Sequence, residues 1–137
     1  MLDLSKPKHA HADERLRNDV MGWLGTVRPD GRPHLVAVWF LWDGETILIF
    51  SKKDQKIRNL QGNTNVIFAL DDTKGGGEVV VIEGEAALLP PLSVTTALPA
   101  YEGKYAQQLA RFGWTGESMS REYTEPIRIT PTRFMGF

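Results

Sequence analysis

The stretch "LGTVRPDGRPHLVAVWFLWDGETILIFS", residues 24–51, sets the architecture of the chain. It holds three apolar runs, rich in β-branched and aromatic residues, that are separated by Asp30-Gly31 and by Asp43-Gly44. An Asp-Gly pair between two such runs is typical of a tight hairpin turn. The stretch therefore predicts a three-stranded antiparallel meander.

The middle run of this stretch, residues 34–42, is apolar on both faces of the predicted strand. Because side chains alternate along a strand, the two faces are Val36, Val38, Phe40 and Trp42 and, opposite them, Leu35, Ala37, Trp39 and Leu41. One face can fill a core, whereas the other needs a cover, which is a helix, a second subunit or a flat ligand. This second face is the first indication of function.

The rest of the chain predicts a small barrel. Leu16, Val20 and Trp23 recur at helical spacing, which predicts a helix over residues 12–24 after a loose tail at residues 1–9. The further elements are a short helix ending at Gly62, strands at 64–70 and 78–89, a helix at 101–113, and a last strand at 125–137 that is broken or bulged at Pro131. Six strands and about three helices in one domain, residues 1–137, favour a closed or nearly closed antiparallel barrel, because closure removes exposed edges.

The composition excludes several classes of protein. With 16 basic and 17 acidic residues the net charge is −1, which argues against a general binder of nucleic acid or membrane surfaces. The lack of cysteine excludes disulfides, thiol catalysis and cysteine-ligated metals. No third ligand accompanies His9 and His11, so no metal site is predicted. The N-terminus is too charged for a signal peptide and no apolar run is long enough to span a membrane, so we expect a soluble cytoplasmic protein.

A basic segment, "SKKDQKIRN", follows the third strand directly at residues 51–59. Ser51 or Asp54 is suited to cap a short helix, and Ile57 and Leu60 are spaced to face the core. Taken alone, these residues are typical of a solvated helix with surface lysines.

The same segment also suits a phosphate. A helix start presents free backbone N–H groups, to which Ser51 would add a hydroxyl and Lys52 and Lys56 two positive charges. The segment is not a Walker loop, because the glycines that wrap phosphates in that motif are missing.

Three other features bear on function. The aromatic run "VWFLW", residues 38–42, suits a planar ring with a phosphate tail but also plain core or dimer packing. "KGGG", residues 74–77, is typical of a mobile hairpin loop and could also approach a ligand with its backbone. No Ser-His-Asp order, His-Glu-x-x-His spacing or carboxylate pair indicates a hydrolase, so in an enzyme a bound cofactor would carry the difficult step.

Residues 24–70, with the pattern LGT–DG–P–VWF–DG–IFS–K–RN, resemble the split β-barrel flavoproteins of the pyridoxamine 5'-phosphate oxidase-like superfamily. The chain looks most similar to the branch of F-420-dependent enzymes, F-420 being a phosphorylated 5-deazaflavin. The C-terminal "IRITPTR" matches more weakly. The resemblance implies a mostly β fold, a six-stranded antiparallel split β-barrel of the FMN-binding type, and a homodimer with two cofactor sites at its interface.

The resemblance also implies which residues hold the cofactor. The ring system would lie against the middle strand and the phosphate over the basic segment. The implied cofactor-binding residues are Ala37, Val38, Trp39, Ser51, Lys52, Gln55, Lys56 and Asn59. A cofactor there would cover the second apolar face and supply an anion for the lysines, in agreement with the interpretation from the residues alone. No catalytic residue is predicted.

The chain departs from the vitamin B6 oxidase of this superfamily in two places. Glu78 and Val79 stand where that enzyme has an Arg-Gln-Val stretch that helps to hold the flavin ring. Its C-terminal Arg-Leu segment is also not evident in "TPTRFMGF". These departures argue against oxidation of pyridoxamine phosphate itself.

Three functions fit these observations. The first is an oxidoreductase that uses F-420 to transfer hydride to or from a small organic substrate, such as an enone, an imine or a quinone-like ring. The second keeps FMN in the same site as an oxidase or reductase. The third is a non-catalytic cofactor-binding protein, which is consistent with the scarcity of polar catalytic residues. The expected partners are a second copy of the chain and a small molecule, without nucleic acid or membrane.

Overall fold

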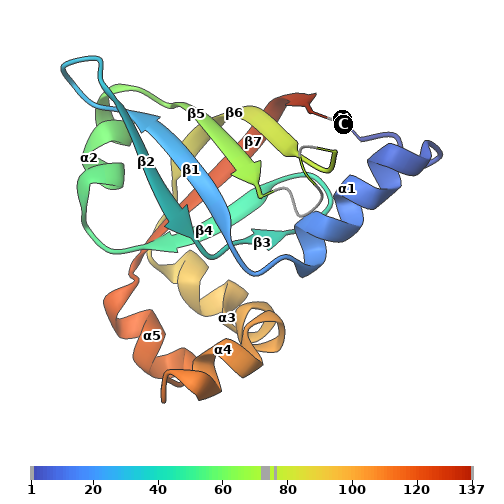
Figure 1. Cartoon of the computed structure of the whole chain (residues 1–137). Helices are drawn as coiled ribbons and strands as arrows, with labels where there is room; N and C mark the ends of the chain where they lie inside the picture. The colour runs from blue at the N-terminus through green and yellow to red at the C-terminus, as the bar shows by residue number, and fades with distance from the viewer. Residues whose placement is uncertain (1, 72–74, 76, 137) are drawn as a thin grey trace.

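The computed structural model describes residues 2–71, 75 and 77–136. The elements follow the chain in this order: α1 (Pro7–Asn18), β1 (Gly22–Val27), β2 (Pro33–Val38), β3 (Leu41–Trp42), β4 (Ile47–Ser51), α2 (Gln55–Gly62), β5 (Asn65–Leu70), β6 (Val80–Leu88), α3 (Leu92–Lys104), α4 (Ala106–Arg111), α5 (Gly116–Glu122) and β7 (Glu125–Met135). Figure 1 shows a strongly curved sheet with α3, α4 and α5 gathered at one end of it. Among the described residues, no helix has the length and apolar character needed to cross a bilayer.

The strands form one antiparallel sheet in the order β2-β1-β5-β6-β7-β4-β3. The strands β2 and β3 lie at opposite ends of this order, yet only Trp39 and Phe40 separate them in the chain. Because so short a connection spans no more than about 11 Å, the sheet must curl until its two edges nearly meet. The predicted mostly β, antiparallel split barrel is confirmed (Figure 1).

The predicted middle strand, residues 34–42, is wrong at its far end. It divides into β2 and the two-residue β3, so the described sheet has seven strands instead of six. Between them, Phe40 is fully buried, and its N–H donates to the hydroxyl of Tyr105 at 2.8 Å. A side chain 65 positions away therefore takes the place of a ladder partner, which no local pattern reveals.

The predicted turns and the predicted bulge are confirmed. Gly31 has a φ of +88° and Gly44 a φ of +97°, in the left-handed region that glycine adopts at little cost. The register of β6 against β7 shifts beside Gly84, which pairs with Pro131. The irregularity thus falls at a proline, which has no N–H to donate to the ladder.

The predictions for the N-terminus are largely wrong. The helix α1 begins at Pro7, which suits a first helical turn, and ends before the predicted helix does. Leu16 is buried as expected, but Val20 is exposed and Trp23 lies on β1, because pairing with β2 and β5 claims that segment. The residues before α1 are not a loose tail, since Leu2 packs against the core.

The helical layer, which is α3, α4 and α5 between β6 and β7, is larger than predicted. The helix expected at 101–113 is the end of α3 followed by α4, and α5 lies outside the prediction. Pro99 lies inside α3 and hides this helix in the sequence, because proline ordinarily breaks one. The predicted loop "KGGG" falls partly outside the described residues.

Two apolar clusters hold the structure together. The larger fills the barrel and contains the buried residues of the middle run together with Ile57 and Leu60 of α2, as predicted. The smaller lies between β4 and the helical layer, and Tyr101 and Tyr105 are its most buried aromatic members. The second face of the middle run is therefore divided, because Trp39 packs against the helical layer while the residues of that face before it are exposed.

Candidate functional site

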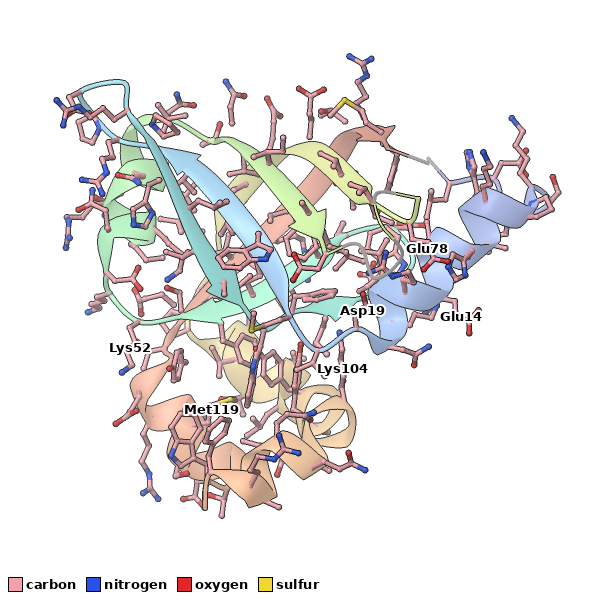
Figure 2. The ribbon with its side chains drawn as sticks, viewed as in Figure 1. Glu14, Asp19, Lys52, Glu78, Lys104 and Met119 are labelled. Atoms are coloured by element: carbon pink, nitrogen blue, oxygen red, sulfur yellow. The ribbon has the colours of Figure 1, made fainter. Side chains whose placement is uncertain are left out.

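A cleft of about 200 Å³ lies where the end of β2, the start of α2 and the helical layer meet. Four of the predicted cofactor-binding residues line it, namely Ala37, Val38, Trp39 and Lys56. Its other described lining residues are Met21, Phe50, Tyr101, Trp114, Met119 and Tyr123. Figure 2 shows Met119 between α5 and the sheet. Apart from one lysine, the described wall of the cleft is apolar or aromatic.

Trp39 is held in place by the helical layer. Its ring stacks on Tyr105 with a centroid separation of 4.4 Å and an angle of 4° between the planes. The Tyr105 hydroxyl accepts from the Phe40 N–H at 2.8 Å and lies 2.7 Å from the Val20 carbonyl oxygen. Lys104 donates from its ammonium group to the Phe40 carbonyl at 2.8 Å. The segment between β2 and β3 is thus fixed through both backbone groups of one residue.

A second stacked pair contributes to the wall of the cleft. Phe50 of β4 and Tyr101 of α3 stack with their centroids 4.4 Å apart and 14° between the planes. Burial, together with the neighbouring Tyr105 and Tyr123, raises the pKa of Tyr101 well above its usual value. The phenol of Tyr101 is therefore protonated at neutral pH.

The cation of the cleft, Lys56, already has a partner. Asp54 caps α2 by accepting from the Lys56 backbone N–H at 3.1 Å, and its second oxygen lies 2.6 Å from the Lys56 ammonium. The Lys56 side chain is only 12% exposed. Of the two expected caps, Asp54 is confirmed and Ser51 is not. A phosphate in the cleft would have to share this lysine with the capping carboxylate.

Three of the remaining predicted residues, on β4 and α2, do not line the cleft. Ser51 is buried, and its hydroxyl donates to the Lys52 carbonyl at 2.8 Å. Asn59 is also buried; it accepts from the Gln55 amide at 2.7 Å and donates to the Thr26 hydroxyl at 2.9 Å, which ties α2 to β1. These polar groups have partners within the chain, and their part in cofactor binding stays a prediction.

Lys52 lies toward the helical layer, with about half of its side chain exposed. Its ammonium lies 3.8 Å from a carboxylate oxygen of Glu122 and 5.2 Å from the ring centre of Tyr123. Figure 2 shows it at the end of the sheet nearest to α5. The structure therefore places one basic side chain on the cleft wall and a second beside a residue of that wall. The role of Lys52 likewise stays a prediction.

A family model described as pyridoxamine 5'-phosphate oxidase matches residues 9–134, nearly the whole chain. The chain belongs to the pyridoxamine 5'-phosphate oxidase family. The match confirms the flavin-binding, split-barrel superfamily that the sequence resemblance indicated. No curated protein sequence matches this chain.

Solved structures support the same placement. One described as an F420 reductase is 27% identical, with 91% of this chain and 96% of that chain covered and a TM-score of 0.70. A conserved hypothetical protein from Mycobacterium tuberculosis is 28% identical, with coverages of 91% and 81% and a TM-score of 0.72. The heme storage protein HutZ from Vibrio cholerae is 19% identical, with coverages of 96% and 93% and a TM-score of 0.64, which shows a shared fold alone.

The cleft of this family member fits part of a flavin or deazaflavin. A flat ring in the cleft would meet aromatic and aliphatic side chains, and a phosphate on that ring would meet Lys56 at the start of α2. Ligand sites commonly enclose about 300–1,000 Å³, which exceeds the volume of about 200 Å³ of this cleft. Among the residues that the structure describes, no cluster of three or more potential metal ligands occurs. The described wall of the cleft is thus suited to an organic ring, and the cleft is smaller than most ligand sites.

The outer face of β2, β1 and β5 carries exposed apolar side chains. Leu35 is 61% exposed and Ile67 is 42% exposed, and both pair with Gly25 between them. Ala37, which lines the cleft, is also exposed. This surface, defined by Leu35, Ala37 and Ile67, includes the part of the second apolar face that the helical layer leaves uncovered.

Sequence reasoning does not find the aromatic half of the cleft. Its residues Phe50, Tyr101, Trp114 and Tyr123 come from β4 and from the helical layer, and each looks like an ordinary core residue in its own segment. The one available signal is the density of aromatic residues between positions 101 and 123. That signal does not distinguish a ligand site from packing between helices.

Proposed function

We propose that the protein is an oxidoreductase that binds coenzyme F-420 in this cleft and transfers hydride to or from a small organic substrate. The observation that carries the proposal is the meeting of a flat apolar wall on β2 with a largely buried lysine at the start of α2. The likeness to a structure described as an F420 reductase, along nearly the full length of both chains, supports the choice of a deazaflavin.

The phosphate would bind at the start of α2. Backbone N–H groups at a helix start attract anions, and Lys56 adds a charge that is shielded from water. Ser51, Lys52 and Gln55 lie around the same turn, and their side chains would reach the phosphate after local rotation. Asn59 would contribute by holding α2 against β1.

The ring would lie against Ala37, Val38 and Trp39. Stacking on Tyr105 limits rotation of the Trp39 ring, so this wall is preorganised. When bound, F-420 supplies the hydride from its reduced ring. The chain contributes orientation and the exclusion of water, because its described cleft-lining residues include neither a carboxylate nor an imidazole.

We also propose that two copies of the chain complete the site. The cleft of one chain is too small for the whole cofactor, and the uncovered surface defined by Leu35, Ala37 and Ile67 adjoins it through Ala37. A second copy on that surface would bury these side chains and close the open side of the cleft. The cytoplasmic location expected from the sequence stays a prediction.

Titration of the purified protein with F-420 and with FMN, followed by fluorescence, tests the cofactor. Lys56→Ala should weaken F-420 binding about 10–150-fold, because a hydrogen bond to a charged group contributes about 1.5–3 kcal/mol. The loss should be larger at low salt, where the charge is less screened. Lys53→Ala is the matched control, since Lys53 is exposed and lies beside the same helix start without lining the cleft.

The titration separates the two cofactors and tests the phosphate site. Tight binding of F-420 with weak binding of FMN supports the proposal, and the reverse order makes the protein an FMN enzyme of the same family. Equal affinities of the Lys56→Ala and wild-type proteins would contradict the phosphate site at α2.

The oligomeric state in solution tests whether two copies of the chain share the site. Sedimentation of the wild-type protein should show a dimer, and Leu35→Glu should shift it toward the monomer and weaken F-420 binding at the same time. Leu92→Glu, at a residue of α3 that is 73% exposed and lies outside this surface, should change neither property. A wild-type monomer that binds F-420 tightly would exclude the shared site.

A second candidate function is cofactor binding without turnover. The observation that favours it is the lack of a carboxylate or imidazole among the described residues of the cleft wall. It predicts tight binding of F-420 together with no oxidation of the reduced cofactor by any of a panel of enones, imines and quinones. Turnover with one of them would exclude this candidate.

A further inference from the structure

The turn between α4 and α5 holds a tryptophan, Trp114, against the cleft. Gly113 has a φ of +69°, and its N–H donates to the Ala110 carbonyl at 3.1 Å. The Trp114 N–H donates to the Leu109 carbonyl at 2.9 Å. The backbone immediately before and at Trp114 is therefore fixed to the end of α4.

The residue after Trp114 is fixed as well. Thr115 caps α5 by accepting from the Ser118 N–H at 3.0 Å, and the Ser118 hydroxyl accepts from the Thr115 N–H at 2.9 Å. This reciprocal pair is a capping box, which stabilises a helix start. Trp114 thus stands between two hydrogen-bonded helix ends, so its backbone needs little ordering when a ligand binds.

The Trp114 ring offers uncovered apolar surface at the cleft. It is 39% exposed although it lines the cleft, and its centroid lies 6.5 Å from that of Trp39 at an angle of 57°. Phe112, which is 57% exposed, lies 5.4 Å from Trp114 between ring centroids. An exposed aromatic side chain on a rigid turn is suited to stack on a flat partner.

The charged side chain on the described cleft wall is Lys56 of α2, which is paired with Asp54, the cap of that helix. The helical layer contributes Tyr101, Met119 and Trp114, none of which is charged at neutral pH. A ligand against the helical layer therefore finds a thioether and aromatic rings but no ionic partner. This environment favours an uncharged ring over a charged one, because a charge would lose its hydration without compensation.

We propose that Trp114 is a specificity-determining residue and that the helical layer selects an uncharged planar ring as the substrate. The inference rests on the proposed function, in which the cofactor ring occupies the β2 side of the cleft and leaves the helical side to the substrate. A planar ring would stack on the indole of Trp114, whereas a small non-aromatic substrate would gain little from it.

Calorimetric titration with menadione, an uncharged planar ring, and with cyclohexenone, a small non-aromatic enone, tests the inference. Both are titrated into the wild-type, Trp114→Ala and Trp114→Phe proteins, each with and without F-420. Trp114→Ala should weaken menadione binding about 5–50-fold, a loss typical of removing one stacked ring, and Trp114→Phe should restore most of it. Cyclohexenone binding should change little in the two variants, and the F-420 titration of each variant shows separately whether the cofactor still binds.

The control for general surface effects is Leu92→Ala. Leu92 is 73% exposed on α3 and does not line the cleft, so menadione binding should match that of the wild type. In turnover with reduced F-420, Trp114→Ala should raise the KM for menadione far more than it lowers kcat.

The outcomes separate this inference from the proposed function. Menadione affinity that is the same in Trp114→Ala and wild-type proteins, or equal losses in the Ala and Phe variants, would overturn the role of Trp114 even when F-420 binds normally. A wild-type protein that binds menadione through Trp114 but does not bind F-420 would support the ring site and reject the proposed cofactor.

Discussion

Replacement of Tyr105 by phenylalanine removes one hydroxyl whose hydrogen bonds hold the segment that closes the barrel. The Tyr105 hydroxyl is the partner of the Phe40 N–H, in the short segment that carries the chain from one edge of the sheet to the other. Both residues are fully buried, so water cannot replace the lost oxygen. Tyr105→Phe therefore leaves a buried N–H group without an acceptor while keeping the ring that stacks on Trp39.

The size of the effect depends on what each group loses. A buried donor left without an acceptor costs about 1–3 kcal/mol, which is the principal loss at the Phe40 N–H. The two carbonyls near the hydroxyl lose less, because the Phe40 carbonyl keeps the bond from Lys104 and Val20 is 38% exposed. We expect about 2 kcal/mol less free energy of unfolding and a Tm lower by roughly 5–10 °C.

Urea unfolding followed by tryptophan fluorescence measures this loss, since Trp39 stacks directly on the altered ring. Tyr101→Phe is the matched control. Tyr101 is almost as buried in the same helical layer, but its hydroxyl makes no hydrogen bond within the part of the chain that the structure describes. If Tyr105→Phe unfolds at the same urea concentration as Tyr101→Phe, the hydroxyl does not stabilise the closure.

Two further changes test other parts of the fold. Burial lowers the pKa of Lys104 to about 8, so at moderately alkaline pH the unfolded chain holds a proton that the folded chain has lost. The free energy of unfolding of the wild type should therefore rise relative to Lys104→Met between about pH 8 and pH 10, and a constant difference in urea midpoints over that range would contradict this. Gly84→Ala should cost about 1–3 kcal/mol in thermal melts, because its Cβ would lie 2.8 Å from both Ile129 and the Thr130 carbonyl. Gly62→Ala, with open space around the new Cβ, should cost far less, and equal losses in the two variants would argue against crowding at the bulge.

The hairpins and the short helix can be predicted because their causes are local. The pairs Asp30-Gly31 and Asp43-Gly44 place glycine where the backbone needs a positive φ, and the structure has turns at both. Asp54 lies where a side chain can cap α2. Such signals depend on a few neighbouring residues, so they survive whatever the rest of the chain does.

The spacing of apolar residues predicts the N-terminal helix in the wrong place, because pairing with other strands competes with helix formation there. Val20 and Trp23 continue the spacing of Leu16, but two other strands take up hydrogen bonds with the segment that contains Trp23. The start of α3 escapes prediction for the opposite reason, since Pro99 disfavours a helix locally and packing of Tyr101 against Phe50 supports one. In both cases tertiary contacts outweigh a weak local preference.

The candidate site, too, can be predicted from the sequence only in part. The sequence indicates the lysine-bearing helix start and the apolar strand, and the cleft brings Ala37, Val38, Trp39 and Lys56 together. The sequence does not indicate that the side chains of Ser51 and Asn59 form hydrogen bonds within the chain. The partner of Asn59 on β1 depends on how α2 docks on the barrel.

Sequence alone accounts for the alternating strands, the tight turns and a basic helix start after an apolar strand, since each follows from periodicity or from backbone angles within a short window. Three-dimensional packing accounts for where the middle strand ends, which half of its second face the helices cover, and why Trp114 stands at the cleft. These features depend on contacts between residues as far apart in the chain as Trp39 and Trp114. They also depend on the curvature that brings the two edges of the sheet together.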